Sequence, residues 1–381
     1  GLPYLLWGPR DEEPLPDGSR LRDTQCGLFA TSRILNRLGV PFTYLPNCRL
    51  DDPVLDKGIL DFIKVAAVVK AFRTLRIGQI GQRIDFFWTV MVNEAELLER
   101  FNLQVWQIYL TDVFAKMRAL VDAPTPALAA LVEEMRAGMR FESLDEQQIR
   151  AIGALKLVME EYIARYDLSA IAIQCFPAIQ QEFGIYPCYA NSLLTECGIP
   201  VICEVDVHGA VSAVLLQAAT LGENPPFFAD LTIRHPGNDQ AELLWHCGSF
   251  PASLADDGID RKVGDHFIMP GADAGVCHWR IRGGDLTIAR FDVERGQYYL
   301  GFGEGRGVPG PKTVGTYVWL EVDDWMTWER TFIRGPYIHH VAGVHGTVAH
   351  ILQEATRYLP GLTPDPIGRT PEELENRWYR A

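Results

Sequence analysis

The chain has 381 residues, of which 48% are hydrophobic and 22% are charged, a balance typical of a globular protein with two or three domains. Its formal net charge of −14 excludes a general nucleic-acid binder, which needs a basic face to displace the counterions of phosphates. Neither a membrane-spanning apolar run nor a signal peptide is visible, so we expect a cytoplasmic protein with no membrane partner.

The first half of the chain alternates strand and helix patterns. A capping box at Ser143–Glu146 predicts the start of a long helix that ends near Tyr166. Alternation of this kind implies a parallel sheet covered on both faces, so we expect a Rossmann-like α/β domain over residues 1–222. The predicted strands are 3–7, 41–45, 105–110, 168–175 and 200–203, and the other predicted helices are 24–38, 55–75, 188–197 and 209–220.

The pattern changes after the turn at residues 222–226, where short β-like runs separated by turn residues begin. This favours a mostly antiparallel, barrel-like domain over residues 223–381, with one helix at 347–358. The glycine-rich segment 301–307 does not open a helix, so we interpret it as a hairpin or loop and not as a dinucleotide-binding fingerprint. The predicted strands are 227–233, 276–281, 286–291, 298–302 and 316–322.

All nine histidines lie between His208 and His350, close to carboxylates at the expected domain junction. Histidine gathered near carboxylates indicates a metal or acid–base site. If the segment 203–209 is extended, Glu204, Asp206 and His208 point to the same side, at the sheet edge where open α/β sheets bind ligands. The spacing alone would equally suit a solvated strand end.

Three further features belong to this candidate site. Asp230 follows two phenylalanines and an alanine, although an exposed turn would also explain it. His246 lies in an apolar run, where a buried core histidine is the plainer interpretation. A late cluster places four histidines within twelve residues, and the spacing does not decide which of them faces the site: His339, His340, His345 and His350.

At these residues the sequence resembles the L-fucose isomerase and L-arabinose isomerase family, from about Arg76 to His350. Six segments follow one another in the family's order, namely 169–176, 200–210, 228–231, 245–248, 284–290 and 343–348. The resemblance implies an aldose–ketose isomerase that works by enediolate proton transfer on a sugar, with Glu204 and Asp230 as its catalytic carboxylates. It also implies a homo-oligomer, either a trimer or a hexamer, and a further Rossmann-like domain before the matched part.

By the same resemblance, the metal ligands are Glu204, Asp230 and His345, with His246 as a fourth. Manganese is the implied ion, and Co²⁺ or Mg²⁺ would also suit these oxygen and imidazole ligands. His339 or His340 stands as the alternative to His345. The remaining candidates, for contacts with substrate hydroxyls, are Gln174, Asp206, His208 and His340.

Other functions stay open on the sequence. A metal-dependent lyase or epimerase acting on a sugar acid or modified sugar would use the same site. A non-catalytic sugar-binding protein would bind sugar without metal, and an inactive remnant of an isomerase would do neither.

Overall fold

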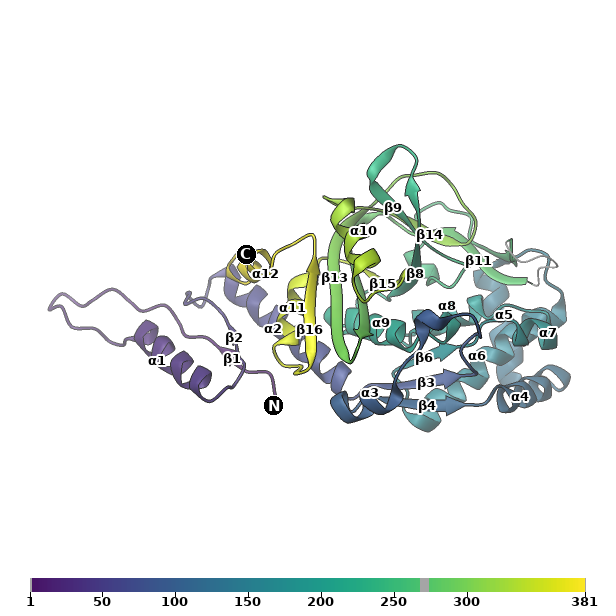
Figure 1. Ribbon diagram of the computed structural model, residues 1–381, viewed down its shortest axis with the longest axis horizontal. Helices are drawn as coiled ribbons and strands as arrows, with labels where there is room; N and C mark the ends of the chain where they lie inside the picture. Colours follow the sequence, from purple (N-terminus) through teal and green to yellow (C-terminus); the bar gives the residue numbers. More distant parts are fainter. Residues whose placement is uncertain (1, 268–273, 381) are drawn as a thin grey trace.

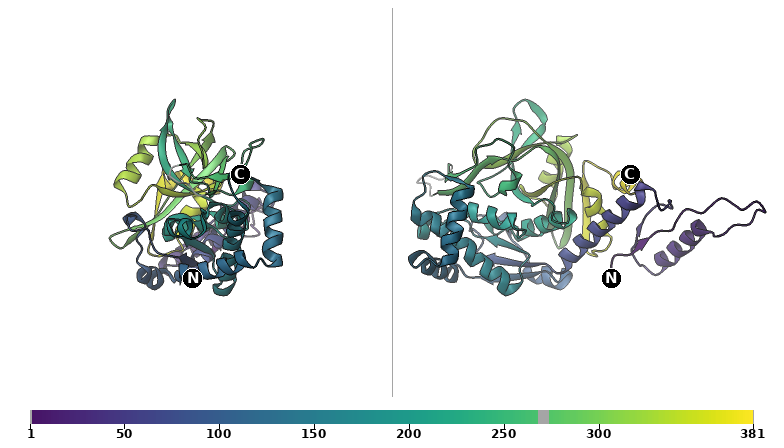
Figure 2. Two further views of the ribbon diagram at one scale, coloured as in Figure 1. Left: turned by 90° about the vertical axis from the view of Figure 1, so that its right-hand side faces the viewer. Right: turned by 180° about the vertical axis from the view of Figure 1, so that it is seen from behind.

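The computed structural model describes residues 2–267 and 274–380, which form a mixed α/β molecule with an arm at one end (Figure 1). The arm also projects from the body when the molecule is seen from behind (Figure 2, right). It contains a two-stranded parallel sheet of β1 (Leu5–Leu6) and β2 (Thr43–Tyr44), joined through helix α1 (Thr24–Arg37). The predicted helix and strands of this region are therefore confirmed.

The arm is attached to the C-terminal part of the chain by buried hydrogen bonds. The Thr43 hydroxyl donates to Glu354 at 2.8 Å and also lies 2.8 Å from the hydroxyl of Tyr358. Helix α1 itself buries only Leu28, whereas Phe29 and Ile34 are exposed. The arm is thus held mainly at its base.

A four-stranded parallel sheet with the order β4-β3-β6-β7 forms the next part, as the alternating pattern predicts. Its central strands are covered on both faces, which is why β6 is an uninterrupted buried run. The strands are β3 (Arg76–Ile80), β4 (Gln104–Ile108), β6 (Ala170–Ile173) and β7 (Val201–Ile202). The helices are α2 (Pro53–Arg73), α3 (Glu94–Phe101), α4 (Leu110–Asp122), α5 (Pro126–Gly138), α6 (Glu146–Tyr166), α7 (Ala178–Phe183), α8 (Cys188–Glu196) and α9 (Val207–Ala219).

The large mixed sheet has the order β16-β13-β12-β15-β8-β9-β14-β11-β10-β5, and most of its pairs are antiparallel. Because β13 also pairs with β14, the pairing returns on itself through β13, β12, β15, β8, β9 and β14. Its strands are β5 (Arg140–Phe141), β8 (Phe227–His235), β9 (Asn238–His246), β10 (Lys262–Asp265), β11 (Ala274–Arg280), β12 (Gly284–Glu294), β13 (Gln297–Val308), β14 (Thr316–Glu321), β15 (His340–His345) and β16 (Leu362–Ile367).

Helix α9 joins the two sheets. It is buried along nearly its whole length and packs against β6 on one side and β12 and β15 on the other. Helices α10 (Trp325–Arg334), α11 (Ala349–Thr356) and α12 (Pro371–Glu375) complete the C-terminal part. The site described below lies where the N-terminus of α9 meets the large sheet.

One local prediction is wrong, and a second is confirmed only in part. The capping box of α6 uses Asp145 and Gln148, because Ser143 has a φ of 64° and not the extended conformation of an N-cap. The glycine-rich segment 301–307, interpreted as a hairpin or loop, lies inside strand β13, which forms an antiparallel hairpin with β12. A Cβ atom at Gly301 would lie 2.6 Å from the ring of Tyr337, and one at Gly303 would lie 2.5 Å from Trp328, so close packing explains these glycines.

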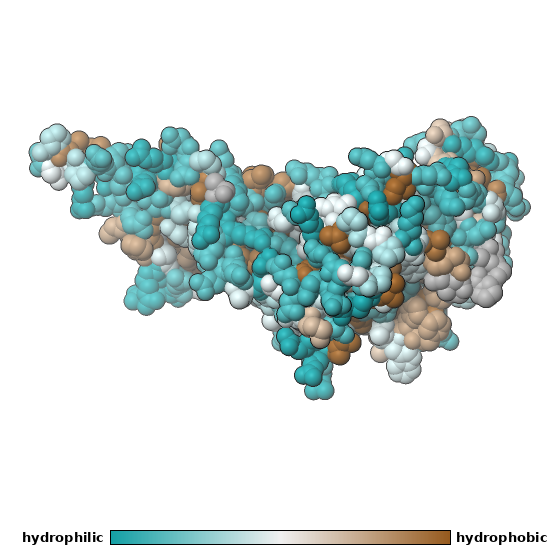
Figure 3. Space-filling view, turned by 90° about the horizontal axis from the view of Figure 1, so that it is seen from above, coloured by the Kyte–Doolittle hydropathy of each residue, from teal (hydrophilic) through white to brown (hydrophobic). Residues whose placement is uncertain are grey.

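The outer surface is largely polar. In the view from above, hydrophilic side chains cover most of the arm and body, and apolar residues form small patches (Figure 3). Over residues 2–267 and 274–380, we find no helix with both the length and the apolar composition needed to span a bilayer.

Candidate metal and active site

Glu204 lies in a tight turn between strand β7 and helix α9. The segment 203–209 is not extended, since Cys203–Val205 forms a short 3₁₀ turn, so the condition under which Glu204, Asp206 and His208 would point to the same side is not met. Glu204 and Val205 have φ angles of 65° and 59°, a left-handed conformation that is costly for a β-branched residue. Asp206 then caps α9 by accepting a hydrogen bond from the amide of Gly209 at 2.8 Å. The turn therefore directs Glu204 and Asp206 out of the sheet edge.

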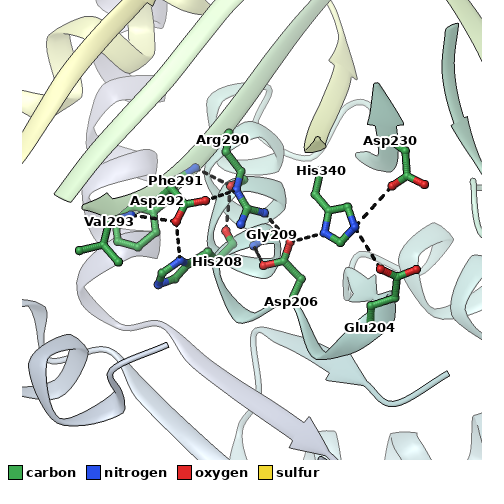
Figure 4. A network of polar contacts seen from close by, with 11 residues as sticks. Glu204, Asp206, His208, Gly209, Asp230, Arg290, Phe291, Asp292, Val293 and His340 are labelled. Carbon is green, nitrogen blue, oxygen red and sulfur yellow. Dashed lines mark hydrogen bonds and ion pairs between the residues drawn. The ribbon is translucent and has the colours of Figure 1, made fainter. Parts of the chain in front are cut away.

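Asp230 and His340 face this turn from the large sheet. They are paired residues on the antiparallel strands β8 and β15, so their side chains are close neighbours. The His340 Nε2 atom lies 3.0 Å from a carboxylate oxygen of Glu204 and 3.5 Å from one of Asp230 (Figure 4). Three elements that are distant in the sequence thus bring two carboxylates and one imidazole to a single point.

The atoms at this point are not satisfied by one another. Within the described part of the chain, His340 Nε2 and Asp230 Oδ1 are buried without a partner in hydrogen-bond geometry. Asp230, His339 and His340 can each direct one ligand atom to a common place, with these atoms within 4.8 Å of one another. Buried polar atoms normally have partners, and oxygen and imidazole donors suit a divalent transition metal. The donor set therefore fits such an ion.

His246 borders the same cluster from the end of strand β9. Its Nδ1 atom accepts a hydrogen bond from the Cys247 amide at 2.9 Å, and its Nε2 atom is buried with no partner among residues 2–267 and 274–380. The ring of Phe228 lies 5.4 Å from that of His246 and 5.0 Å from that of His340. His246 therefore lies beside Glu204, Asp230 and His340, and its Nε2 atom is free to bind a ligand.

Burial and charge act in opposite directions on the pKa values of these residues. Burial raises the pKa of Glu204, but its contact with His340 and the charges of His340 and His246 outweigh this, so the net shift is downward. Burial lowers the pKa of His340, but Asp206, Glu204 and Asp230 together raise it to about 9. The cluster thus favours ionised carboxylates and attracts positive charge, either a proton or a metal ion.

The structure does not bring His345 to this point. His345 lies at the other end of β15, paired with Leu286, and its Nε2 atom is 3.0 Å from the carbonyl oxygen of Arg282. Five residues of a strand span roughly 16 Å, and the odd offset turns the side chain to the opposite face of the sheet. Of these histidines, it is therefore His340, the alternative to His345, that lies beside Glu204 and Asp230.

The other sequence candidates contact protein groups. Asp206 is 0% exposed, which leaves no surface for a sugar hydroxyl, and its side chain contacts His340 and Arg290. His208 lies in α9, and its Nδ1 atom is 3.2 Å from a carboxylate oxygen of Asp292, away from Glu204, Asp230 and His340. Gln174 accepts a hydrogen bond from the amide of Gln82 at 3.0 Å and so links two loops at the sheet edge.

Sequence reasoning missed Arg290 and Asp292. Arg290 is 1% exposed and pairs with Asp206 and with Asp292, the latter at 2.8 Å. Both residues occur in the apolar strand β12, and a charged side chain in such a run is expected to be partnered. Their charge within an apolar run is the sequence signal that could have identified Arg290 and Asp292 as partnered residues.

Comparisons with known proteins agree with the resemblance. Residues 1–73 match the family "Fucose/sulfoquinovose isomerase, N-terminal domain", and residues 244–361 match "L-fucose isomerase, C-terminal domain". A sulfoquinovose isomerase of Alkalicoccus urumqiensis is 28% identical over 76% of this chain. A sulfoquinovose isomerase of Priestia aryabhattai is 27% identical over 94% of this chain.

The alignments cover only part of each relative. The chain spans 63% of the length of the Alkalicoccus protein and 78% of that of the Priestia protein. His246 and His340 lie within the matched C-terminal domain, whereas Glu204 and Asp230 lie between the two matched domains. Two family domains in the expected order, together with these relatives, place the chain in the fucose isomerase-like family.

Proposed function

We propose that the protein is a divalent-metal-dependent aldose–ketose isomerase whose site consists of Glu204, Asp230 and His340, with His246 and His339 at its border. The observation that carries the proposal is the convergence of two carboxylates and one imidazole, with His340 Nε2 at 3.0 Å from Glu204 and 3.5 Å from Asp230. Mn²⁺ suits this donor set, and Co²⁺ or Mg²⁺ would serve the same role.

The chemistry requires a proton to move between C1 and C2 of the sugar while another moves between O1 and O2. A divalent cation in this site would supply a Lewis acid for the negative charge that develops on the sugar oxygens. Glu204 and Asp230 are the two carboxylates that can accept and return these protons, one at carbon and one at oxygen. The lowered pKa of Glu204 keeps it ionised and ready to act as a base at neutral pH.

For the substrate, we propose sulfoquinovose, an aldose carrying a sulfonate, because the relatives that match most of this chain are named sulfoquinovose isomerases. L-Fucose and L-arabinose are the comparison substrates, given the matched fucose isomerase domain and the sequence resemblance. The homo-oligomeric state and the cytoplasmic location stay predictions. Sedimentation velocity of the purified chain would measure the first of these.

The test is ketose formation, followed by NMR, from sulfoquinovose, L-fucose and L-arabinose. The protein is first treated with EDTA and then resupplied with Mn²⁺. We expect no turnover after EDTA and recovery with Mn²⁺, with sulfoquinovose the best substrate. A protein that binds Mn²⁺ but converts none of the three aldoses would overturn the isomerase proposal, and conversion of L-fucose alone would overturn the substrate assignment.

A further inference from the structure

A chain of buried charges lies behind His340, on the side away from Glu204 and Asp230. The Nδ1 atom of His340 is 2.9 Å from the Oδ2 atom of Asp206 (Figure 4). The same oxygen also accepts a hydrogen bond from the guanidinium of Arg290. Arg290 in turn donates from Nε to Asp292 at 2.8 Å. All four side chains are buried, and together they connect the N-terminus of α9 with strands β12 and β15.

The chemistry of this chain decides which nitrogen of His340 carries the proton. Arg290 is always a donor, and a buried carboxylate beside it stays ionised, so Asp206 can only accept hydrogen bonds. The remaining oxygen of Asp206 accepts from the amide of Gly209 at 2.8 Å, which fixes the orientation of the carboxylate. The Nδ1 atom of His340 must therefore be the donor.

With the proton on Nδ1, the neutral imidazole presents a bare lone pair at Nε2. That atom is the one that points at Glu204 and Asp230. Histidines that bind metals commonly donate their other ring nitrogen to a carboxylate, which fixes the ring and its tautomer. The geometry of His340 matches this arrangement, with one difference: the supporting carboxylate is itself held by a buried arginine.

We propose that Asp206, held by Arg290, is a positioning residue that orients His340 and directs its Nε2 lone pair to the metal. This inference rests on the proposed function, since it assumes a metal at Glu204, Asp230 and His340. Asp206 and Arg290 are both buried, so their proposed role includes no contact with the sugar. The expected consequence of losing the Asp206 carboxylate is weaker metal binding, because His340 would no longer be restricted to the ligating tautomer.

The first experiment measures Mn²⁺ affinity by isothermal titration on the EDTA-treated protein and its Asp206→Asn variant. In the variant, a single amide group cannot accept from both Gly209 and the pair of His340 and Arg290. We expect the dissociation constant to rise about 10- to 100-fold, the usual effect of removing such a supporting partner. The matched control is Asp61→Asn, which removes another buried carboxylate bonded to a histidine, His350, at 3.1 Å and outside the site.

The outcomes separate this inference from the proposed function. Wild-type protein that takes up no Mn²⁺ would overturn the metal site and this inference with it. Wild-type binding with an Asp206→Asn affinity within threefold of it would overturn the positioning role alone. A loss of affinity in Asp206→Asn that is matched in Asp61→Asn would also overturn it, because general destabilisation would then suffice as the cause.

A second measurement does not depend on the Asp206→Asn variant. Histidine ¹⁵N NMR of the metal-free wild-type protein at pH 10 reports the tautomer of each neutral imidazole, and His340→Gln identifies the His340 signals by their loss. We expect His340 to carry its proton on Nδ1. A proton on Nε2 would contradict the proposal, whatever the stability of the Asp206→Asn variant.

Discussion

The two ends of strand β15 carry histidines with opposite surroundings. At one end, His340 lies between Asp206 on one ring nitrogen and Glu204 and Asp230 on the other. At the other end, the ring of His345 contacts the carbonyl oxygen of Arg282, and the pKa of His345 is lowered by burial. Both residues come from one short segment of sequence, yet only His340 is surrounded by anionic groups.

The difference shows that the partners, and not the histidine or its strand, determine the charge around each imidazole. Three carboxylates raise the pKa of His340 to about 9 in spite of burial, whereas burial lowers the pKa of His345, whose ring contacts a backbone carbonyl oxygen. The same contrast predicts which substitutions damage function and which affect only local packing.

The largest expected effect is that of Glu204→Gln. The substitution keeps the size of the side chain but removes the charge and the ability to accept a proton, so we expect ketose formation to fall by about 10²- to 10⁴-fold. Steady-state assays with Mn²⁺ would measure the loss. Glu242→Gln, which neutralises a buried carboxylate on β9 outside the cluster, should leave turnover within threefold. Near-normal turnover in Glu204→Gln would remove this residue from the mechanism.

The second prediction concerns the two ends of β15 directly. His340→Gln removes the imidazole at the convergent point and should weaken Mn²⁺ binding by at least 100-fold, whereas His345→Gln should change it by less than threefold. Titration of both EDTA-treated variants with Mn²⁺ makes the comparison. The reverse order of affinities would identify His345, and not His340, as the metal ligand.

A third prediction tests the same contrast through stability. An ion that binds only the folded state stabilises it by about 2.7 kcal/mol at a hundredfold excess over its dissociation constant. Mn²⁺ should therefore raise the melting temperature of the wild-type protein and of His345→Gln by several degrees, and EDTA should reverse the shift. Differential scanning calorimetry should show no such rise in His340→Gln, and a full rise there would contradict the assignment.

The smallest effect is expected at Glu242, a buried acid outside the cluster whose ion pair with Arg234 is long, at 4.0 Å. Burial raises the pKa of Glu242 to about 7, although Arg234 partly opposes this. Between about pH 4.5 and 7 the folded protein therefore binds more protons here than the unfolded chain, so this group lowers stability as the pH rises.

Glu242→Gln should remove that pH dependence. We expect the variant to melt about 1–2 °C higher than wild type at pH 8 and at nearly the same temperature at pH 5. Thermal denaturation at the two pH values is the measurement. A variant that is less stable than wild type at pH 8 would show that the Glu242 carboxylate is stabilised by a partner when ionised.

The elements with strong local signals could be predicted from the sequence. Helices α1, α2, α8 and α9 and strands β6 and β7 lie where periodicity and turn residues place them. Strand β13 could be predicted only over its start, 298–302, because the glycines that follow are set by close packing against residues such as Trp328, which approach only in the folded sheet. Strand β15 was not predicted, although His340 and His345 at its ends were candidate site residues.

For the site, the sequence by itself determined the chemical types: two carboxylates, Glu204 and Asp230, and a late histidine near a domain junction. Only the tertiary structure decided which histidine joins them, because the register of β15 against β8 pairs His340 with Asp230 and turns His345 to the other face. Spacing along the chain does not encode strand register, which is set by partners far away in sequence. The buried pair of Asp206 and Arg290, 84 positions apart, follows from the same tertiary packing.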